Sequence, residues 1–302
     1  MIRRVAALVL VSVALLARGA VAQTVFEVSG TPPLEAALWL PDGATRAPLV
    51  LLLHGAGGRW SELAPLGAAL AGAGIAAAGF TQVADRSAPN AFARMAARAR
   101  TASRVLDAVL VRAGDRVDPG RLGVFGYSAG ATAAMLLIGG RADPARWRAL
   151  CEVAPQERLC LSPFGQSALA AADAPAFTAP DSRFRAAMLA APALGFLFAG
   201  DGMRGVPPGT AVRLWRAEAD SLLAEPNHAE AIAPLLPGHP VPSVVPGADH
   251  WVFTPPCGPE RRAAEPWLCA DPPGFDRAAF HRAFRADAIA FFRAALAPPA
   301  ER

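Results

Sequence analysis

The stretch RLGVFGYSAGATAAMLLI, residues 121–138, combines an apolar strand, a glycine-flanked turn and a helix in direct succession. Arg121–Phe125 is typical of a buried strand, and Ala131–Ile138 favours a helix. Between them, Gly126–Gly130 has the pattern G-x-S-x-G. Glycines two residues to either side of Ser128 allow strand and helix to pack closely around a strained turn. The pattern therefore predicts a nucleophilic serine presented by the turn, and the alternative is a serine that only caps the helix.

Strands and helices alternate on both sides of this stretch. Two opening strands, Val25–Gly30 and Glu35–Leu40, are separated by turn-forming prolines and predict an antiparallel start. The continuous apolar run Leu49–Leu53 is typical of a strand buried on both faces. Alternation of this kind predicts an α/β fold, with a mostly parallel central sheet flanked by helices. The other predicted strands are 74–80, 185–191, 212–217 and 243–245, and the predicted helices are 62–73, 90–114 and a terminal helix that includes Phe280 and Leu296.

The N-terminus has the three parts of a signal peptide. Two arginines within Met1–Arg4 precede the apolar run Val5–Leu16, and small alanines at 20 and 22 suit a signal peptidase. We therefore expect cleavage after residues 1–22 and an exported protein, periplasmic or extracellular. A membrane anchor is the alternative, but the apolar run is short for a bilayer span.

Residues 23–302 are long enough for one large domain with a substantial core, and the irregular segment 139–180 predicts an inserted cap or lid. No second apolar stretch has membrane-spanning length, so we expect no membrane span once the leader is removed. The formal net charge of +4 would fall to +1, because three arginines leave with the leader. A nearly neutral domain without lysine gives no sign of nucleic-acid binding.

Four cysteines follow the predicted leader, and four cysteines allow three pairings among which the sequence does not choose. The two close pairs, Cys151–Cys160 and Cys257–Cys269, fit an oxidising compartment, where each disulfide would staple one loop. Metal ligation is the competing interpretation. Neither pair has the short gap of a zinc knuckle, so we expect no metal site.

A second glycine-rich motif, His54–Gly58, directly follows the predicted strand Leu49–Leu53. Acyl transfer by a serine requires two backbone N–H groups that converge on a negatively charged oxygen. We expect these donors at Ala56 in this loop and at Ala129, next to Ser128. A glycine-rich turn without a role is the alternative. A phosphate-binding loop is disfavoured because the G-K-[ST] ending is missing.

A nucleophilic serine needs a histidine base and an orienting carboxylate, and the expected chain order is serine, acid, histidine. Of five histidines, His250 follows the predicted strand 243–245, in a turn at the expected edge of the sheet. A lone histidine is more often structural, but its order and placement favour His250 as the base. The other histidines lie in the glycine loop, among prolines or inside the terminal helix: His54, His228, His239 and His281.

The candidates for the orienting acid are Asp201, Glu218, Asp220 and Asp249. Asp201 precedes the strand 212–217 and so lies at the wrong edge of a parallel sheet. The side chain of Asp249 adjoins that of His250, and neighbouring side chains diverge. Catalytic groups in open α/β sheets lie just beyond the carboxyl ends of strands, which favours Asp220 over Glu218. The alternative role of Asp220 is to cap a following helix.

These motifs together resemble a known family. The turn 126–130, the loop 54–58, the segment LWRAEAD at 214–220 and the run 245–250 are similar to bacterial proteins known as predicted dienelactone hydrolases, within the α/β-hydrolase superfamily. The tail is similar as well, in Cys257, Cys269 and the stretch PGFDRAAFH at 273–281. The resemblance covers most of residues 23–302 and implies an α/β-hydrolase fold with a triad of Ser128, Asp220 and His250.

Dienelactone hydrolases proper are known for a cysteine nucleophile, whereas this turn carries Ser128 and the four cysteines lie elsewhere. The resemblance therefore implies an exported serine hydrolase that cleaves carboxylic esters through an acyl-enzyme intermediate, without a metal or organic cofactor. Secreted lipases, cutinases and polyester hydrolases share the serine triad on this scaffold. The resemblance therefore does not decide whether the ester is a small molecule, a lipid or a polymer. A non-catalytic binding protein of the same fold is the alternative, and the complete triad favours the enzyme.

Overall fold

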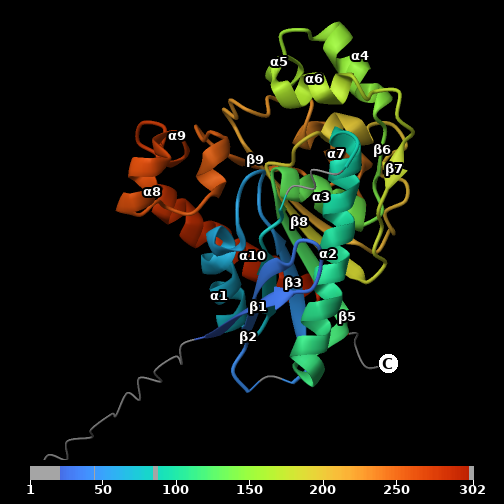
Figure 1. The fold of residues 1–302 in the computed structure, drawn as a ribbon. Coiled ribbons are helices and arrows are strands. Elements are labelled where there is room, and N and C mark those ends of the chain that lie inside the picture. The colour runs from blue at the N-terminus through green and yellow to red at the C-terminus, as the bar shows by residue number, and fades with distance from the viewer. Residues whose placement is uncertain (1–20, 44, 84–87, 299–302) are drawn as a thin grey trace, which may run out of the picture.

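The computed structural model describes residues 21–43, 45–83 and 88–298, and residues 1–20 of the predicted signal peptide lie outside them. Eight strands form one sheet in the order β1-β2-β4-β3-β5-β8-β9-β10 (Figure 1). In this sheet β1 with β2 and β2 with β4 are antiparallel, and every other pairing is parallel. The predicted α/β architecture is thus confirmed, including its antiparallel start. The strands are β1 Ala22–Val28, β2 Leu34–Leu40, β3 Ala47–Leu53, β4 Ala76–Phe80, β5 Val117–Tyr127, β8 Phe184–Ala190, β9 Ala211–Ala217 and β10 Ser243–Val245.

The centre of the sheet is apolar on both faces. All seven residues of β3 are buried, and neighbours along a strand point to opposite faces. Leu49 and its alternate neighbours pack in one hydrophobic cluster with α2 and α3, whereas Val50 and Leu52 pack in another with α1 and α10. Helices therefore cover both faces of the sheet, as Figure 1 shows. They are α1 Ala64–Gly72, α2 Ala91–Ala113, α3 Ala129–Leu137 and α10 Arg277–Ala295.

Strand β5 is longer than the predicted strand 121–125. It begins at Val117, and its register with β3 shifts before Leu122. The residues between, DPGR at 118–121, include a proline without an N–H and a glycine, which are typical of an irregular strand. The turn-like composition of this stretch therefore marks a bulge within the strand.

A group of short helices lies over the carboxyl ends of the parallel strands (Figure 1). These helices belong to the irregular segment 139–180, and a disulfide between Cys151 and Cys160 joins two of them. Together they roof the end of the sheet at which the site lies. The elements of the segment are β6 Arg141–Ala142, α4 Ala145–Val153, α5 Arg158–Leu161, α6 Pro163–Leu169 and β7 Phe177–Thr178.

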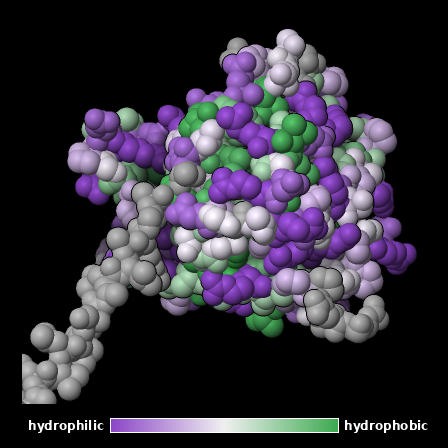
Figure 2. All heavy atoms as spheres, turned by 90° about the horizontal axis from the view of Figure 1, so that it is seen from below, coloured by the Kyte–Doolittle hydropathy of each residue, from purple (hydrophilic) through white to green (hydrophobic). Residues whose placement is uncertain are grey.

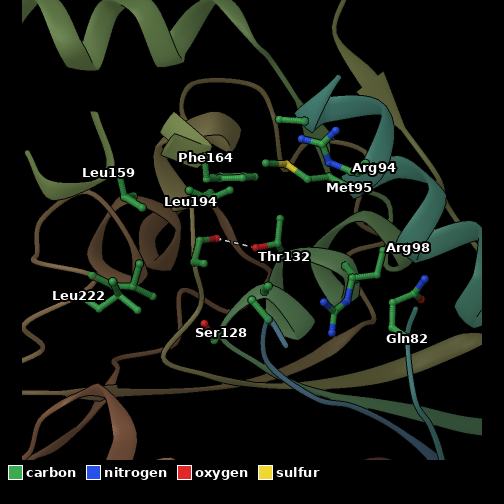
Figure 3. Close-up of a pocket in the computed structure, with 16 residues that line it drawn as sticks. Gln82, Arg94, Met95, Arg98, Ser128, Thr132, Leu159, Phe164, Leu194 and Leu222 are labelled. Carbon is green, nitrogen blue, oxygen red and sulfur yellow. Dashed lines mark hydrogen bonds between the residues drawn. The ribbon is translucent and has the colours of Figure 1, made fainter. Parts of the chain in front are cut away.

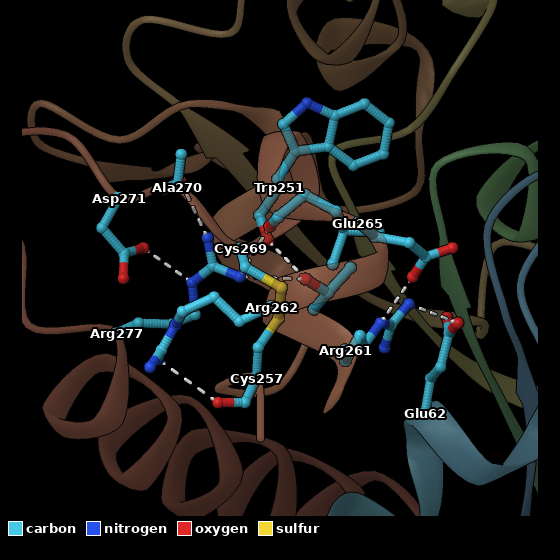
Figure 4. Close-up of a disulfide and its surroundings, with 12 residues drawn as sticks. Glu62, Trp251, Cys257, Arg261, Arg262, Glu265, Cys269, Ala270, Asp271 and Arg277 are labelled. Carbon is cyan, nitrogen blue, oxygen red and sulfur yellow. Dashed lines mark hydrogen bonds and ion pairs between the residues drawn. A yellow bond between two sulfur atoms is a disulfide. The ribbon is translucent and has the colours of Figure 1, made fainter. Parts of the chain in front are cut away.

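A second excursion, with α8 Pro259–Ala264 and α9 Pro266–Cys269, projects beside the sheet (Figure 1). The second disulfide, Cys257–Cys269, closes this excursion. Figure 4 shows the buried guanidinium of Arg277, which donates hydrogen bonds to one carboxylate and to two backbone carbonyls of the excursion. The disulfide and this arginine together attach the excursion to the start of α10.

The end of the molecule opposite the roof is seen in Figure 2, where hydrophilic residues cover much of the surface and smaller hydrophobic areas lie between them. None of the described helices is long and apolar enough to cross a membrane. Short helical turns complete the described chain: Trp60–Leu63, Gly114–Arg116, Gly195–Phe198, α7 Ala229–Ile232, Ala233–Leu235 and His250–Phe253.

Candidate active site

Ser128 lies at the turn between β5 and α3. Its backbone has φ +54° and ψ −119°, a strained conformation for a residue other than glycine. A Cβ atom at Gly126 would lie 2.5 Å from the carbonyl oxygen of Gly130, and a Cβ atom at Gly130 would collide with the carbonyl oxygen of Leu53. Only glycine fits at both positions, and the G-x-S-x-G pattern therefore holds the serine in this turn.

The structure brings His250 and Asp220 to Ser128. His250 Nε2 is 3.0 Å from Ser128 Oγ, and His250 Nδ1 is 2.7 Å from Asp220 Oδ2. Ser128 follows the carboxyl end of β5, Asp220 that of β9 and His250 that of β10. The side chains of His250 and Asp220 are only 1% and 6% exposed. In this arrangement the carboxylate orients the imidazole, and Nε2 is within reach of the serine proton.

Asp220 uses its two carboxylate oxygens for different partners. Oδ1 accepts hydrogen bonds from the backbone N–H groups of Leu222 at 3.0 Å and Leu223 at 2.7 Å, while Oδ2 faces His250. No helix begins directly after Asp220, because residues 221–223 form a bend and the next helix is α7. The helix-capping alternative is therefore not borne out, and Oδ1 instead holds the backbone of this bend.

The other three candidate carboxylates have different partners. Glu218 accepts a hydrogen bond at 2.7 Å from a backbone N–H of the turn before His250, and Asp201 pairs with an exposed arginine. Asp249 accepts hydrogen bonds from the backbone N–H groups of Ser221 and His250. Burial alone would raise the pKa of Asp249, but these hydrogen bonds lower it. Asp249 thus fixes the backbone beside the histidine, and its carboxylate is already occupied.

Ala56 and Ala129 line the same pocket as Ser128. Within the described residues, neither of their backbone N–H groups donates a hydrogen bond to the chain. Ala129 is the first residue of α3, where an N–H has no acceptor inside the helix. The loop of Ala56 passes so close to the serine turn that a Cβ atom at Gly55 would lie 3.0 Å from the Tyr127 ring. Two free donors therefore lie at the pocket beside the serine.

Two further histidines, His54 and His228, are buried near the site. His228 Nδ1 accepts a hydrogen bond from the backbone N–H of Leu194 at 3.1 Å, and burial lowers the pKa of His228 to about 4. Burial and the neighbouring charge of Arg98 likewise lower the pKa of His54 to about 4. Both imidazoles are therefore neutral at neutral pH. The position of His228 among prolines and polar residues gave no signal of this burial.

The pocket at Ser128 has a volume of about 280 Å³ and is lined mainly by apolar side chains. Figure 3 shows Leu159 and Phe164 of the roof facing Ser128 across the pocket, with Leu222 and Leu194 beside them. The segment 139–180, for which the sequence predicts an inserted cap or lid, therefore contributes two side chains to the pocket wall.

Polar groups gather at one side of this pocket, where Gln82, Arg94 and Arg98 lie (Figure 3). The sequence predicts the helix that carries both arginines only as a crossover helix. The one available signal is their four-residue spacing, which places them on the same helix face but is equally typical of a solvated face. In the described residues, no group of three or more histidine, cysteine, aspartate or glutamate side chains is arranged to hold a metal ion.

No protein-family model and no curated protein sequence matches this chain. Among solved structures, an esterase of Pyrobaculum calidifontis has a TM-score of 0.51 at 16% identity, over 91% of this chain and 86% of that chain. A cold-adapted esterase from an Arctic intertidal metagenomic library has a TM-score of 0.45 at 17% identity, over 83% of this chain and 92% of that chain. The first of these similarities, together with the sheet order, shows that the chain has the α/β-hydrolase fold.

Proposed function

We propose that this protein is a serine hydrolase that cleaves carboxylic esters, with Ser128 as nucleophile, His250 as general base and Asp220 as orienting acid. The observation that carries the proposal is the continuous chain of contacts, 3.0 Å from Ser128 Oγ to His250 Nε2 and 2.7 Å from His250 Nδ1 to Asp220 Oδ2. Three groups from three strand ends meet at these distances, and Ser128 lines the pocket, which is the arrangement that acyl transfer requires.

In the proposed reaction, Ser128 Oγ attacks the ester carbonyl carbon while His250 Nε2 takes the hydroxyl proton. The carbonyl oxygen becomes an oxyanion, which the N–H groups of Ala56 and Ala129 stabilise. When the intermediate collapses, the carbon–oxygen bond to the alcohol breaks, His250 returns the proton to the leaving alcohol, and an acyl-serine remains. Water activated by the same histidine then releases the acid and restores the serine.

The pocket supports a small, largely apolar ester as substrate. Its volume of about 280 Å³ lies near the lower end of the range for small-molecule sites. Leu159, Phe164, Leu194 and Leu222 supply apolar walls for an acyl chain. A serine in the turn where dienelactone hydrolases carry cysteine favours simple esters over dienelactone. A lipid or polymer substrate would have to extend beyond this pocket.

We expect purified protein to release p-nitrophenol from a short-chain p-nitrophenyl ester in a burst of one equivalent per protein, followed by a slower steady rate. The burst reports acylation, and the slower phase reports hydrolysis of the acyl-serine. Ser128→Ala should abolish the burst. A burst of equal size in Ser128→Ala would exclude this serine as the nucleophile, and a folded wild-type protein without ester hydrolysis would favour a binding protein.

We also propose that the protein is exported. The leader-like residues 1–22 and the two disulfides, Cys151–Cys160 and Cys257–Cys269, support an oxidising compartment. Protein recovered from the periplasm or the medium should begin at Gln23, with an intact mass four hydrogens below that of the fully reduced chain. A recovered protein that retains Met1 or carries free thiols would contradict export.

A further inference from the structure

Arg98 contacts the loop that carries Ala56. Its Nη2 donates a hydrogen bond to the carbonyl oxygen of His54 and lies 3.4 Å from the carbonyl oxygen of Gly55. The residue is half-buried, and burial lowers the pKa of its guanidinium to about 10. At neutral pH Arg98 therefore remains charged, and within the described residues it has no carboxylate partner.

An enclosed cation without a carboxylate is unfavourable unless other groups solvate it. Here the backbone carbonyls of the glycine loop solvate the guanidinium, so the charge of Arg98 lies next to the peptide groups of this loop. The side chain also lines the pocket of Ser128, as Figure 3 shows. The arginine thus lies between α2, which carries it, and the loop whose N–H we assign to the oxyanion.

The imidazole of His54 contacts the carbonyl oxygen of Gly55, which Arg98 also approaches. The backbone N–H of Gln82 donates to His54 Nε2 at 2.9 Å, which assigns the imidazole proton to Nδ1. Nδ1 lies 2.6 Å from the carbonyl oxygen of Gly55 and so donates to it. Arg98 Nη2 lies 3.4 Å from Nδ1, but a protonated Nδ1 cannot accept, so the guanidinium makes no hydrogen bond with the imidazole. The Gly55 carbonyl is therefore held by the neutral imidazole of His54 and by the backbone N–H of Gly58 at 3.3 Å, and it is approached by the cationic guanidinium of Arg98.

The Gly55–Ala56 peptide connects these contacts to the proposed chemistry. The C=O and N–H of a planar trans peptide point in opposite directions. When donors hold the Gly55 carbonyl on one side, the Ala56 N–H must face the other way, and Ala56 lines the pocket beside Ser128. A positive charge at the carbonyl also polarises the peptide and makes its N–H a stronger donor.

We infer that Arg98 is a positioning residue of the oxyanion hole, which with His54 orients and polarises the Gly55–Ala56 peptide so that the Ala56 N–H meets the oxyanion. This inference rests on the proposed ester hydrolysis. It gives Arg98 a role in the transition state and none in binding the ground-state ester, and this difference makes it testable.

Arg98→Met removes the donor and the charge but keeps most of the side-chain stem. We expect kcat for a p-nitrophenyl ester to fall by about 10²-fold, the size typical of a lost oxyanion donor, with KM changed less than about threefold. Arg98→Lys keeps the charge without the planar fork, and its kcat should fall by about tenfold. Arg104→Met, on the exposed side of the same helix, is the matched control and should leave both constants unchanged.

A trifluoromethyl ketone separates positioning from general structural damage, because the serine oxygen adds to it and creates a tetrahedral oxyanion. The matching trifluoromethyl alcohol occupies the same pocket without forming that oxyanion. In Arg98→Met the ketone should bind more weakly by the factor by which kcat/KM falls, while the affinity of the alcohol stays within about threefold of wild type. If Arg98→Met does not fold, the same pair of affinities in Arg98→Lys decides the question.

The inference is overturned if Arg98→Met retains kcat within threefold of wild type, or if ketone and alcohol lose affinity equally. A folded wild-type protein that neither hydrolyses the ester nor binds the ketone would remove the proposed function, and the role of Arg98 with it. An active wild type with an unaffected Arg98→Met would remove only the role of Arg98.

Discussion

The two carboxylate oxygens of Asp220 have different partners, one in the backbone and one in the imidazole of His250. Oδ1 holds the chain that leads to Leu222 and Leu223, and Oδ2 holds the imidazole of His250. An asparagine at this position has one oxygen and one NH₂ group, so it can satisfy the backbone donors or accept from His250 Nδ1, but not both in the same way. The substitution therefore tests the imidazole contact without removing side-chain volume.

We predict that Asp220→Asn keeps the fold but lowers kcat by up to about 10⁴-fold, the size of the analogous change in a serine protease, because the imidazole is left in the wrong tautomer. Steady-state kinetics with circular dichroism as a check of folding measures this. Glu218→Gln is the matched control, since Glu218 accepts only from a backbone N–H, and its kcat should change far less. Near-normal turnover in Asp220→Asn together with loss in Glu218→Gln would reassign the acid.

Single residues differ in how far the sequence predicts them. The strained turn at Ser128 was predictable because the glycines that permit it lie two residues away, so the pattern is local. The position of the glycine-rich loop 54–58 was predictable because it directly follows the apolar run of β3, and its role in an oxyanion hole stays a prediction. Arg98 was not, because its partners are backbone carbonyls more than forty residues earlier in the chain, which leave no trace in the residue types around it.

At the scale of elements, the roof of α4, α5 and α6 contains a disulfide and also supplies part of the pocket wall. The Cys151–Cys160 disulfide ties α4 to α5, and Leu159, next to the second cysteine, lines the pocket with Phe164 of α6. A disulfide that closes so short a loop contributes about 2–3 kcal/mol in the chain-entropy account. Its loss should loosen the apolar wall of the pocket more than it affects the contacts of the proposed triad.

We predict that Cys151→Ser combined with Cys160→Ser lowers the preference for hexanoyl over acetyl p-nitrophenyl esters by roughly tenfold. A change of this size corresponds to lost burial of about two of the additional methylenes, at about 0.8 kcal/mol each. The ratio of kcat/KM for the two esters measures this. Cys257→Ser combined with Cys269→Ser removes the other disulfide, which does not line the pocket, and should leave the ratio unchanged. An equal change in both double variants would refute the role of the roof in acyl selection.

The elements themselves were largely predictable where burial gives a continuous apolar run, as in β3, or a helical period, as in α2. The ends of β5 were not, because a bulge and a turn share the same residue types. The helices of the roof have four to nine residues each, too few for a helical period to emerge, so the sequence indicated only an irregular insertion.

At the scale of the whole molecule, the fold buries histidines in their neutral form. The pKa of His54 and of His228 is lowered to about 4, from 6.5, mainly by burial. Between these values the unfolded chain binds a proton that the folded chain does not, so the free energy of unfolding falls as the pH drops. Each histidine should contribute about 3 kcal/mol of stability above pH 6.5, which is lost as the pH approaches 4.

We predict that the midpoint of urea unfolding falls steeply between pH 6.5 and pH 4, and that His228→Asn removes part of this slope. Asparagine keeps an oxygen that can accept from the Leu194 N–H but does not titrate. Urea titrations across this range measure the effect, with His239→Gln, at an exposed histidine, as the control. If neither His228→Asn nor His239→Gln changed the pH dependence of the urea midpoint, the burial of His228 as a neutral imidazole would be contradicted.

The pocket also belongs to this scale, because it is assembled from segments that are far apart in the chain. Gln82, Met95, Ser128, Phe164, Leu194 and Leu222 all line it. The sequence predicted the sheet edge at which Ser128, Asp220 and His250 meet, since that edge follows from strand order. It did not predict the pocket walls, because their meeting depends on how the roof and the loops pack over the sheet.

The most direct test of the central claim, that Ser128 is an activated nucleophile, is labelling with a fluorophosphonate followed by peptide mass spectrometry. Such a probe reacts with a serine that a base and an oxyanion hole activate. We predict a single adduct on the peptide that contains Ser128 in the wild-type protein and no adduct in Ser128→Ala. Equal labelling of both proteins, or a folded wild type that takes no label, would contradict the claim.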